Sequence, residues 1–367
     1  MNALVVGAGI HGVTVACELA SHGFKVTIIE SNREILLGTS NGTHNRVNMG
    51  YHYPRSIETV RECNEGFEYF KRNLSSALFY PSSCYYLIEK NNSKVTAKEY
   101  NDLLDEVDLK YSIEFPKQSL INKKNIEMSF KVWEPCYDVS ILRRMFHQKI
   151  ENLRVTLWTG FEIVDADIDG KNVTIKSSTN HTFKDKFDVI VNATYAFTNN
   201  VQKIFGCNEV KKKYKFQKTE VVVATMNKKI LPAMTVMDGP FITILPYAYG
   251  GHKNEYLVYD VVNSVREESV GHYLPRSFTN IDCETNYSEM LVSGRRYFTF
   301  MDDLVPRSSL WATRPIPLNT FDDDARITNL VKHDNHDCFY SMLEGKFVSA
   351  PLLSQKITNT ILEDLSP

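Results

Sequence analysis

Residues 3–30 read ALVVGAGIHGVTVACELASHGFKVTIIE, and this stretch decides the fold. Its first four residues are all apolar, as in a strand of a parallel sheet that is buried on both faces. The glycine motif GAGIHG, residues 7–12, follows at once, and apolar side chains then recur at helical spacing as far as Gly23. A second β-rich run ends on Glu30. The order strand, glycine motif, helix, strand and acid predicts a βαβ unit of a parallel sheet.

Each part of this unit has a physical role in binding a dinucleotide. Gly7 permits the tight turn, Gly9 lets the backbone approach a pyrophosphate, and Gly12 lets the helix pack close to the strand. The helix N-terminus offers free N–H groups to the phosphates. The Glu30 carboxylate can accept hydrogen bonds from ribose hydroxyls and would repel a phosphorylated ribose, which disfavours NADP. The alternative is a glycine-rich turn without a ligand, and the motif alone fits both FAD and NAD.

The composition excludes several classes of protein. The chain has 367 residues, of which 43% are hydrophobic and 23% charged, as in a globular protein of two domains. Lys and Arg number 42 against 44 Asp and Glu, so no basic excess supports binding to nucleic acid. The apolar runs are too short for a membrane-spanning helix. A globular protein without a membrane-spanning helix and without nucleic acid as its partner is therefore expected.

The cysteines and the N-terminus indicate the cellular compartment. The seven cysteines include no CxxC pair, and their odd number is not typical of a disulfide framework, so we expect reduced thiols and no metal site. Met1 is followed almost directly by a strand pattern, which leaves no room for the charged start of a secretion signal. Both observations predict a cytoplasmic protein.

The segment after the βαβ unit favours a longer cofactor than NAD. Residues 37–46 are small, polar and glycine-containing, which predicts a loop rich in hydrogen-bond donors instead of a regular crossover. Such a loop suits an extended cofactor that continues past the pyrophosphate. Residues 47–55 then contain three ring side chains in a row, Tyr51, His52 and Tyr53, and have the character of a site segment.

These segments together resemble a known family. The glycine motif, Gly38-Thr39-Ser40 and the segments 44–46 and 50–53 are similar to those of FAD-dependent oxidoreductases of the D-amino-acid oxidase type. That family includes glycine and sarcosine oxidases, D-amino-acid oxidases and L-2-hydroxyglutarate oxidases. Asn48 departs from the pattern, because hydroxyglutarate-oxidase-like relatives carry a histidine there. A mechanism that uses that histidine is therefore not expected.

The resemblance implies an α/β fold in which a Rossmann-type FAD-binding domain is interleaved with a mainly antiparallel-sheet substrate domain. The strand-like pattern from 216 to 300, broken by Gly and Pro, is typical of such a sheet. In the family it forms the roof of the substrate cavity, which Tyr247, Tyr249 and Tyr259 either line or support as core residues. The expected FAD-binding segments are 1–83, 139–210 and 301–367, and the expected substrate-domain segments are 84–138 and 211–300.

A late motif predicts how the substrate binds. Residues 311–317, WATRPIP, resemble the Gly-Leu-Arg-Pro strand of glycine and D-amino-acid oxidases, in which the arginine forms a bidentate pair with the substrate carboxylate. A planar guanidinium matches a carboxylate and does not deprotonate, so the resemblance implies this role for Arg314. The alternative is a structural arginine paired with one of the aspartates at 322–324.

The resemblance also implies the remaining cofactor contacts. Ile163 best matches the apolar residue whose backbone binds the adenine, with sheet core as the alternative. The strand ending at Ala193 matches one that closely approaches the cofactor, although Tyr195 replaces the usual glycine. In the family the N-terminus of the last helix points at the flavin N1–C2=O edge and stabilises the reduced flavin. The expected cofactor-binding residues are Gly7, Gly9, Ile10, His11, Gly12, Glu30, Ser31, Thr39, Ser40, Ile163, Ala193, Gly345, Lys346, Phe347 and Val348.

Together these features predict an enzyme, an FAD-dependent oxidase or dehydrogenase. We expect hydride transfer to flavin N5 from the amine carbon of a small, anionic, amino-acid-like substrate, with O2 or another electron acceptor. The alternatives are a 2-hydroxyacid oxidase or dehydrogenase and a non-catalytic dinucleotide-binding module. A neutral amine needs no protein base, whereas an alcohol needs one, for which His52 or His44 is the candidate. The expected catalytic residues are Arg314, His52, His44 and Asn48.

Overall fold

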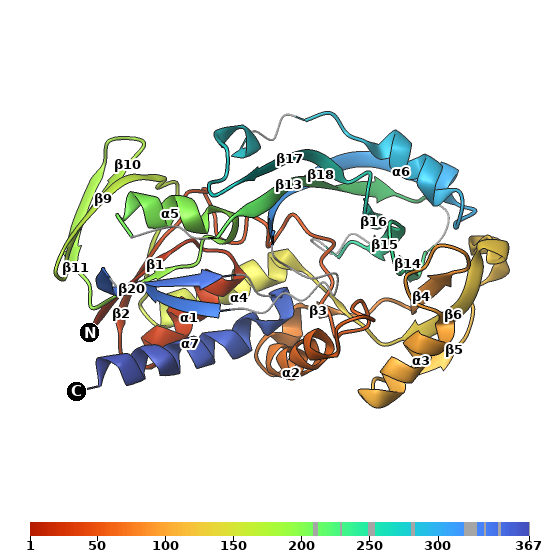
Figure 1. Ribbon diagram of the computed structural model, residues 1–367, viewed down its shortest axis with the longest axis horizontal. Coiled ribbons are helices and arrows are strands. Elements are labelled where there is room, and N and C mark those ends of the chain that lie inside the picture. The colour runs from red at the N-terminus through yellow and green to blue at the C-terminus, as the bar shows by residue number, and fades with distance from the viewer. Residues whose placement is uncertain are drawn as a thin grey trace.

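The computed structural model contains two large sheets that lie beside each other, with most of the helices on one side of them (Figure 1). The structure describes residues 1–207, 212–227, 230–248, 254–279, 283–318, 329–333, 335–343 and 346–366. Within these ranges, no helix has both the length and the apolar character that crossing a bilayer requires. All seven cysteines are free thiols, as expected from the sequence.

The first sheet has six strands and contains the βαβ unit. Its order is β19-β20-β12-β1-β2-β8, and every neighbouring pair is parallel except β19 with β20. The central strand β1 is fully apolar after its first residue and is buried on both faces, as its sequence predicted. The strands are β1 (Asn2–Val6), β2 (Lys25–Ile29), β8 (Thr156–Trp158), β12 (Val189–Asn192), β19 (Asn329–His333) and β20 (His336–Leu343).

Four helices pack together beside this sheet and share one hydrophobic core with it. They are α1 (Ile10–Ser21), α2 (Ile57–Leu74), α4 (Val139–Asn152) and α7 (Ala350–Leu365). Local sequence explains where they begin. The Asp138 side chain accepts from the backbone N–H groups of Ser140 and Ile141, which caps α4. Pro351 lies in the first turn of α7, where its missing N–H costs nothing.

The other face of the six-stranded sheet is covered by a small antiparallel sheet and by α5 (Thr198–Ile204). This sheet has the order β11-β10-β9, and both of its neighbouring pairs are antiparallel. Its strands are β9 (Ile163–Asp169), β10 (Asn172–Ser177) and β11 (Thr182–Lys186). The parallel sheet is thus covered on both sides, as its apolar strands require.

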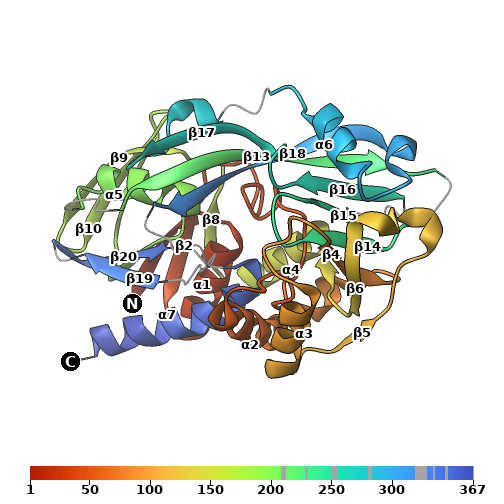
Figure 2. The same cartoon turned by 45° about the vertical axis from the view of Figure 1, so that its right-hand side comes forward.

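The second large sheet has nine strands and is antiparallel except where β14 meets β4. Its order is β17-β13-β16-β15-β14-β4-β6-β5, with β18 paired on β13 (Figure 2). This arrangement confirms the mainly antiparallel substrate domain. The strands are β4 (Cys84–Glu89), β5 (Tyr111–Ile113), β6 (Ile126–Val132), β13 (Tyr214–Thr225), β14 (Ala233–Met237), β15 (Ile242–Pro246), β16 (Glu255–Asp260), β17 (Val265–Gly271) and β18 (Val305–Pro317).

The nine-stranded sheet is built from two separate parts of the chain, which confirms that the two domains are interleaved. Its β18 pairs with β13 along nearly its whole length, whereas the expected boundary assigned residues 301–317 to the FAD-binding domain. Residues 287–294 form helix α6 (Tyr287–Gly294) inside the region expected to be strand-like. The remaining elements are α3 (Ala97–Glu106) and a short pair formed by β3 (Leu78–Phe79) and β7 (Cys136–Tyr137).

Candidate functional site

The glycine motif forms a backbone contact that no other residue would permit. Gly7 has a φ of +97°, and a Cβ atom there would lie 2.9 Å from the carbonyl oxygen of Ala193. A Cβ atom on Gly12 would overlap the Gly7 carbonyl oxygen. A Cβ atom on Gly9 would meet only the Ser40 hydroxyl within 4 Å, at 3.4 Å. The first and third glycines therefore serve packing, and the space beside the second remains open for a ligand.

The loop at residues 37–46 joins the glycine motif to β18. The Ser40 hydroxyl accepts a hydrogen bond of 3.0 Å from the backbone N–H of Ile10, the first residue of α1. The Thr39 hydroxyl donates to the carbonyl oxygen of Thr313 over 3.3 Å. The segment is a loop, as the sequence predicted, and it ties a cofactor motif to the strand that carries Arg314.

Glu30 lies at the carboxyl end of β2 beside the glycine motif, where the sequence placed it. One carboxylate oxygen accepts from the backbone N–H of Ala8 at 2.7 Å. The other accepts from the backbone and side-chain N–H groups of Asn32, both at 2.7 Å, and from the Ser31 hydroxyl at 3.2 Å. Neutral donors thus fix the orientation of a buried carboxylate, which keeps its negative charge available for a hydroxyl-bearing ligand.

His11 lies at the start of α1 with both ring nitrogens enclosed and with the backbone of Lys346 as a hydrogen-bonding neighbour. Burial lowers the pKa of His11 to about 4, and the Lys346 backbone partly offsets this effect. The ring is therefore neutral at physiological pH. At least one nitrogen of this enclosed ring is left for a polar ligand to contact.

The segment before α7 lies against the same region. The Phe347 ring stacks on Tyr137 with 3.9 Å between the ring centroids, and the Tyr137 hydroxyl donates to the Ser40 carbonyl oxygen at 2.8 Å. Val348 is buried in the core under the helices. Gly345, expected to contact the cofactor, lies outside the described residues.

Two other expected cofactor contacts lie in different sheets. One begins β9 of the three-stranded sheet, and the other follows β12 of the six-stranded sheet. Ile163 begins β9, pairs opposite Ser177 and is partly buried against the core between the two sheets. Ala193 follows β12 and contacts the Gly7 turn. The sequence suggested that the close glycine contact with the cofactor beyond Ala193 is lost or replaced, because Tyr195 stands where the family has glycine. Tyr195 instead adopts a φ of +54°, so the backbone retains the left-handed conformation that glycine favours.

Three of the four expected catalytic side chains, those of Arg314, His44 and His52, lie in a row of rings with a cation at each end, which we call the aromatic arc. Neighbouring members lie between 3.7 and 6.5 Å apart, measured to ring centroids. Strands β18 and β16 each supply one member, and the loop at 43–53 supplies three. The last member directly precedes the short 3-10 helix Phe347–Ser349. In order, the arc consists of Arg314, Tyr259, His44, His52, Tyr53 and Lys346.

Arg314 ends the arc on the substrate sheet. Its Nη2 donates to the side-chain oxygen of Gln217 at 2.8 Å, and the Gln217 amide in turn donates to Glu268. Its Nε is enclosed and has no hydrogen-bond partner among the described residues. The aspartates at 322–324, considered as partners from the sequence, lie outside the described residues. The guanidinium is thus held by a neutral amide and keeps donors for an anion.

His44 occupies the middle of the arc with its ring edge-on to Tyr259, 5.6 Å between centroids. Its Nδ1 is enclosed without a hydrogen-bond partner among the described residues. Burial, together with the charges of Arg46 and Arg314, lowers the pKa of His44 to about 3. His44 is therefore a neutral imidazole with an available lone pair.

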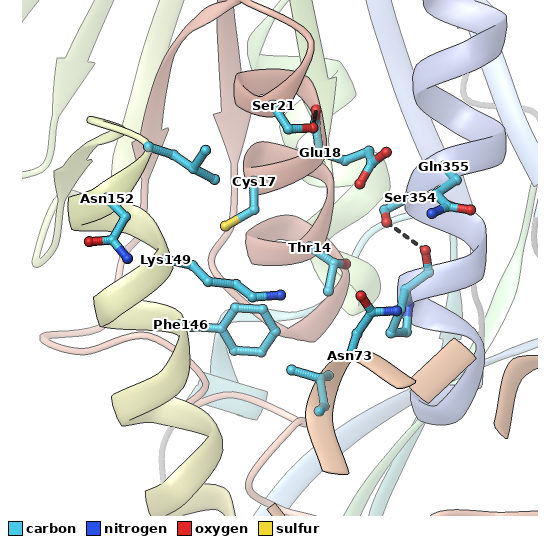
Figure 3. Close-up of a pocket in the computed structure, with 13 residues that line it drawn as sticks. Thr14, Cys17, Glu18, Ser21, Asn73, Phe146, Lys149, Asn152, Ser354 and Gln355 are labelled. Atoms are coloured by element: carbon cyan, nitrogen blue, oxygen red, sulfur yellow. Dashed lines mark hydrogen bonds between the residues drawn. The ribbon is translucent and has the colours of Figure 1, made fainter. Parts of the chain in front are cut away.

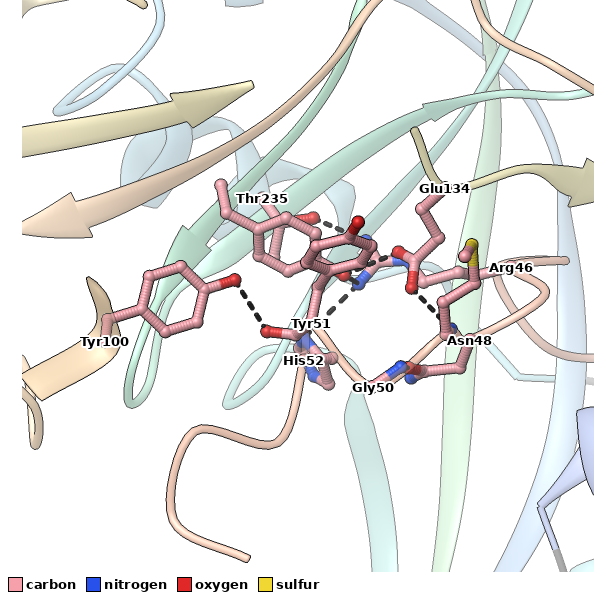
Figure 4. Close-up of polar contacts among 10 residues, drawn as sticks. Arg46, Asn48, Gly50, Tyr51, His52, Tyr100, Glu134 and Thr235 are labelled. Carbon is pink, nitrogen blue, oxygen red and sulfur yellow. Dashed lines mark hydrogen bonds and ion pairs between the residues drawn. The ribbon is translucent and has the colours of Figure 1, made fainter. Parts of the chain in front are cut away.

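A buried polar network holds His52 and was not predicted from the sequence (Figure 4). Arg46 forms an ion pair with Glu134, with 3.3 Å between Nε and Oε2. Its Nη1 donates to the Tyr86 hydroxyl at 2.6 Å and contacts the His52 Nδ1 at 3.3 Å, and its Nη2 donates to Thr235. Burial raises the pKa of Glu134, and the Arg46 charge opposes that rise. The network joins the loop to β4 and β14 of the substrate sheet.

Asn48 lies in the same loop but shapes its turn. The Asn48 side-chain oxygen accepts from the backbone N–H of Gly50 at 2.9 Å. The neighbouring Met49 N–H donates to Glu134 at 2.8 Å. The contact to Gly50 gives Asn48 a structural role, and its expected catalytic role stays a prediction.

A cleft of about 340 Å³ lies apart from the arc, among helices α1, α4 and α7 (Figure 3). It includes Cys17, whose thiol pKa is raised to about 11 by burial, and the Lys149 ammonium. It shares no residue with the arc or the glycine motif. Within the described ranges, no three His, Cys, Asp or Glu side chains group in a way that would hold a metal ion.

Comparison with known proteins agrees with the fold and the glycine motif. The family DAO, described as FAD dependent oxidoreductase, matches residues 2–336. The FAD-dependent monooxygenase kojA of Aspergillus flavus is 30% identical over 104 residues, which are 27% of this chain and 24% of that protein. The chain thus aligns with about a quarter of the length of this curated relative.

Two solved structures illustrate the similarity of fold. Glycine oxidase from Bacillus cereus has a TM-score of 0.74 and 13% identity, over 100% of this chain and 96% of that chain. L-alpha-glycerophosphate oxidase from Mycoplasma pneumoniae with FAD bound has a TM-score of 0.72 and 15% identity, over 99% of this chain and 94% of that chain. At this level of identity the likeness concerns the fold alone.

Proposed function

The chain belongs to the DAO family of FAD-dependent oxidoreductases, and from this premise we propose that it oxidises a small, carboxylate-bearing amine. The main support for the proposal is the position of the Arg314 guanidinium and the contacts that it makes. Its guanidinium lies at one end of the aromatic arc, donates to a neutral amide and has an enclosed Nε without a partner among the described residues. A carboxylate matches this arrangement because it can accept two parallel hydrogen bonds from the fork.

The residues around the glycine motif fit FAD. The open space beside Gly9 admits a pyrophosphate, and the fixed carboxylate of Glu30 suits ribose hydroxyls. The enclosed ring of His11, which has the backbone of Lys346 as a neighbour, has a nitrogen left for a polar cofactor edge. These residues, with Ser40 and the segment from Lys346, would hold the cofactor. When bound, FAD supplies the two-electron oxidant that accepts hydrogen from the substrate C–H bond.

The chain's own residues bind and orient the substrate. Arg314 holds the carboxylate, and the Tyr259 ring beside it supplies an apolar surface that excludes water from the ion pair. At the other end of the arc, the Lys346 ammonium lies 3.7 Å over the Tyr53 ring and adds positive charge. The described part of the arc contains cations and neutral rings and no carboxylate, which favours an anionic substrate.

A 2-hydroxy acid is the second candidate, and one observation favours it. Oxidation of an alcohol needs a group that takes the hydroxyl proton, and His44 is a neutral imidazole in the arc. Both candidates carry a carboxylate next to the carbon that is oxidised, so both rest on Arg314.

Anaerobic reduction of the bound flavin by matched pairs of compounds tests the proposal. Each amino acid, N-methyl amino acid or 2-hydroxy acid is compared with the amine or alcohol that lacks the carboxylate. We expect loss of the flavin absorption band only with carboxylate-bearing members, and the amine and hydroxyl series then distinguish the two candidates. Equal reduction by compounds with and without the carboxylate would exclude the anionic substrate.

A further inference from the structure

We propose that anion binding at Arg314 turns His44 into the acceptor of the substrate's ammonium or hydroxyl proton. The inference rests on the proposed function and deepens it, because it names the group that takes the proton. It also restricts the substrate to compounds that carry an anion and an acidic N–H or O–H on neighbouring atoms, such as a zwitterionic amino acid or a 2-hydroxy acid.

The geometry places both groups against the same ring. The Tyr259 centroid lies 5.9 Å from the Arg314 guanidinium carbon and 5.6 Å from the His44 centroid. A small substrate whose carboxylate binds Arg314 would then direct its amine or hydroxyl along Tyr259 toward His44. The enclosed Nδ1 of His44 has no described protein partner.

The charges around His44 explain why an anion matters. The charged and titratable groups that face it among the described residues are Arg46 and His52 from its own loop, Tyr259 from β16 and Arg314 from β18. The charge of Arg46 is already balanced by Glu134. Arg314 donates to a neutral amide, and its charge also helps to lower the pKa of Glu268, to which that amide donates.

Arg314 is thus a positive charge near His44 that a ligand can neutralise. Burial and the two arginines hold the pKa of His44 at about 3 before an anion binds. A carboxylate on Arg314 cancels one repulsive charge and adds an attractive one, so the pKa of His44 rises on binding. The imidazole becomes a stronger base only when a substrate is present.

His52 is the other candidate base from the sequence, and its contact with Arg46 fixes it as an N–H donor instead. Its Nδ1 lies 3.3 Å from Nη1 of Arg46. A guanidinium only donates, so Nδ1 is the acceptor and the ring proton of neutral His52 lies on Nε2. In this tautomer His52 presents an N–H group to its surroundings and does not accept a proton there.

The proton passes from the substrate ammonium to the His44 imidazole. One N–H bond of the substrate ammonium breaks, its electron pair remains on the amine nitrogen, and the proton binds a ring nitrogen of His44. The product is a neutral amine, whose lone pair assists oxidation of the adjacent C–H bond. For a 2-hydroxy acid, the O–H bond breaks in the same way.

The experiment uses an anion that has no proton to give. Methanesulfonate remains an anion at every pH of the assay and is titrated into the FAD-loaded protein by calorimetry in two buffers of different ionisation enthalpy. We expect proton uptake on binding that increases from pH 7.5 to pH 5, with a several-fold fall in Kd over the same range. Binding without proton uptake and with a pH-independent Kd overturns the coupling.

Three variants separate the coupling from the anion site. His44→Asn should bind methanesulfonate without proton uptake, whereas His52→Gln should retain the uptake. The reverse pattern in these two histidine variants overturns the assignment of His44. Arg314→Gln should weaken binding at least tenfold at every pH. Unchanged binding in Arg314→Gln would instead contradict the proposed function, because the anion would then bind elsewhere. Flavin absorbance and circular dichroism check that each variant is folded and loaded.

Discussion

Gln217 lies directly opposite Arg314 in the pairing of β13 with β18, and its side-chain oxygen accepts a 2.8 Å hydrogen bond from the guanidinium. The amide nitrogen of Gln217 donates to Glu268, which also pairs with Lys215 at 3.2 Å. The amide thus stands between a cation and a carboxylate and keeps them from pairing directly. This arrangement orients Arg314 without neutralising it.

We expect Gln217→Glu to impair anion binding far more than Gln217→Ala. A carboxylate at position 217 would pair with Arg314 and compete with the substrate, at a cost of about 1.5–3 kcal/mol, the strength of a charged hydrogen bond. The Kd for methanesulfonate measures the effect. Thr225→Ala, at the far end of the same strand, is the control, and equal affinities of the Glu and Ala variants would contradict the role of the neutral amide.

Substitution of Arg314 itself should separate charge from geometry. Arg314→Lys keeps the charge but removes the planar fork, so we expect a several-fold or greater loss of substrate affinity. Arg314→Ala should cost about 2–5 kcal/mol in kcat/KM, because the substrate carboxylate is left unpaired. The FAD content, read from the flavin absorbance, should not change. Loss of FAD from either variant would place Arg314 in the cofactor site.

Gly9 and Gly12 should fail in different ways when substituted. A Cβ atom at Gly9 meets only the Ser40 hydroxyl, so Gly9→Val should fold and lose FAD, since the side chain fills the space that the pyrophosphate needs. A Cβ atom at Gly12 overlaps the Gly7 carbonyl, so Gly12→Ala should lower the free energy of unfolding of the apoprotein by about 1–3 kcal/mol or more. Flavin content and denaturant unfolding distinguish the two. A full flavin complement in Gly9→Val would refute the fingerprint.

The enclosed histidines predict acid sensitivity of the apoprotein. The pKa values of His11 and His44 are lowered to about 4 and about 3, whereas both residues titrate near pH 6.5 when unfolded. The unfolded chain therefore binds more protons below pH 6.5, and stability falls as the pH falls from 6.5 toward 4, by about 1.4 kcal/mol per pH unit for each histidine.

Denaturant unfolding of the apoprotein at several pH values measures this slope. His11→Asn should reduce it by about half, whereas substitution of the exposed His22 serves as the control and should leave it unchanged. An identical slope in His11→Asn would show that other groups cause the acid sensitivity.

The βαβ unit and its cofactor motif could be predicted because their signals are local. The strand pattern and the glycines at positions 7, 9 and 12 each act within a few residues. Arg314, His44 and His52 were also predicted, and the structure brings them together in one arc.

The partners of these residues could not be predicted, because they depend on strand register. Gln217 faces Arg314 only through the pairing of β13 with β18. Arg46 contacts Thr235 of β14 and Glu134, which follows β6. The hydrophobic periodicity of a strand does not show which residues of another strand lie opposite it. The positive φ of Tyr195 was also hidden, because tyrosine rarely adopts that conformation.

The loop between the glycine motif and β18 limits how this enzyme can be re-engineered. Ser40 contacts the start of α1, Thr39 contacts Thr313, and Gly42 lies so close to the Trp311 carbonyl oxygen that any side chain there would overlap it. The nine-stranded sheet is therefore not an exchangeable module. A chimera that takes this sheet from a relative needs a strand that packs equally close to Gly42. Otherwise the contacts between the loop at 37–46 and β18 are lost.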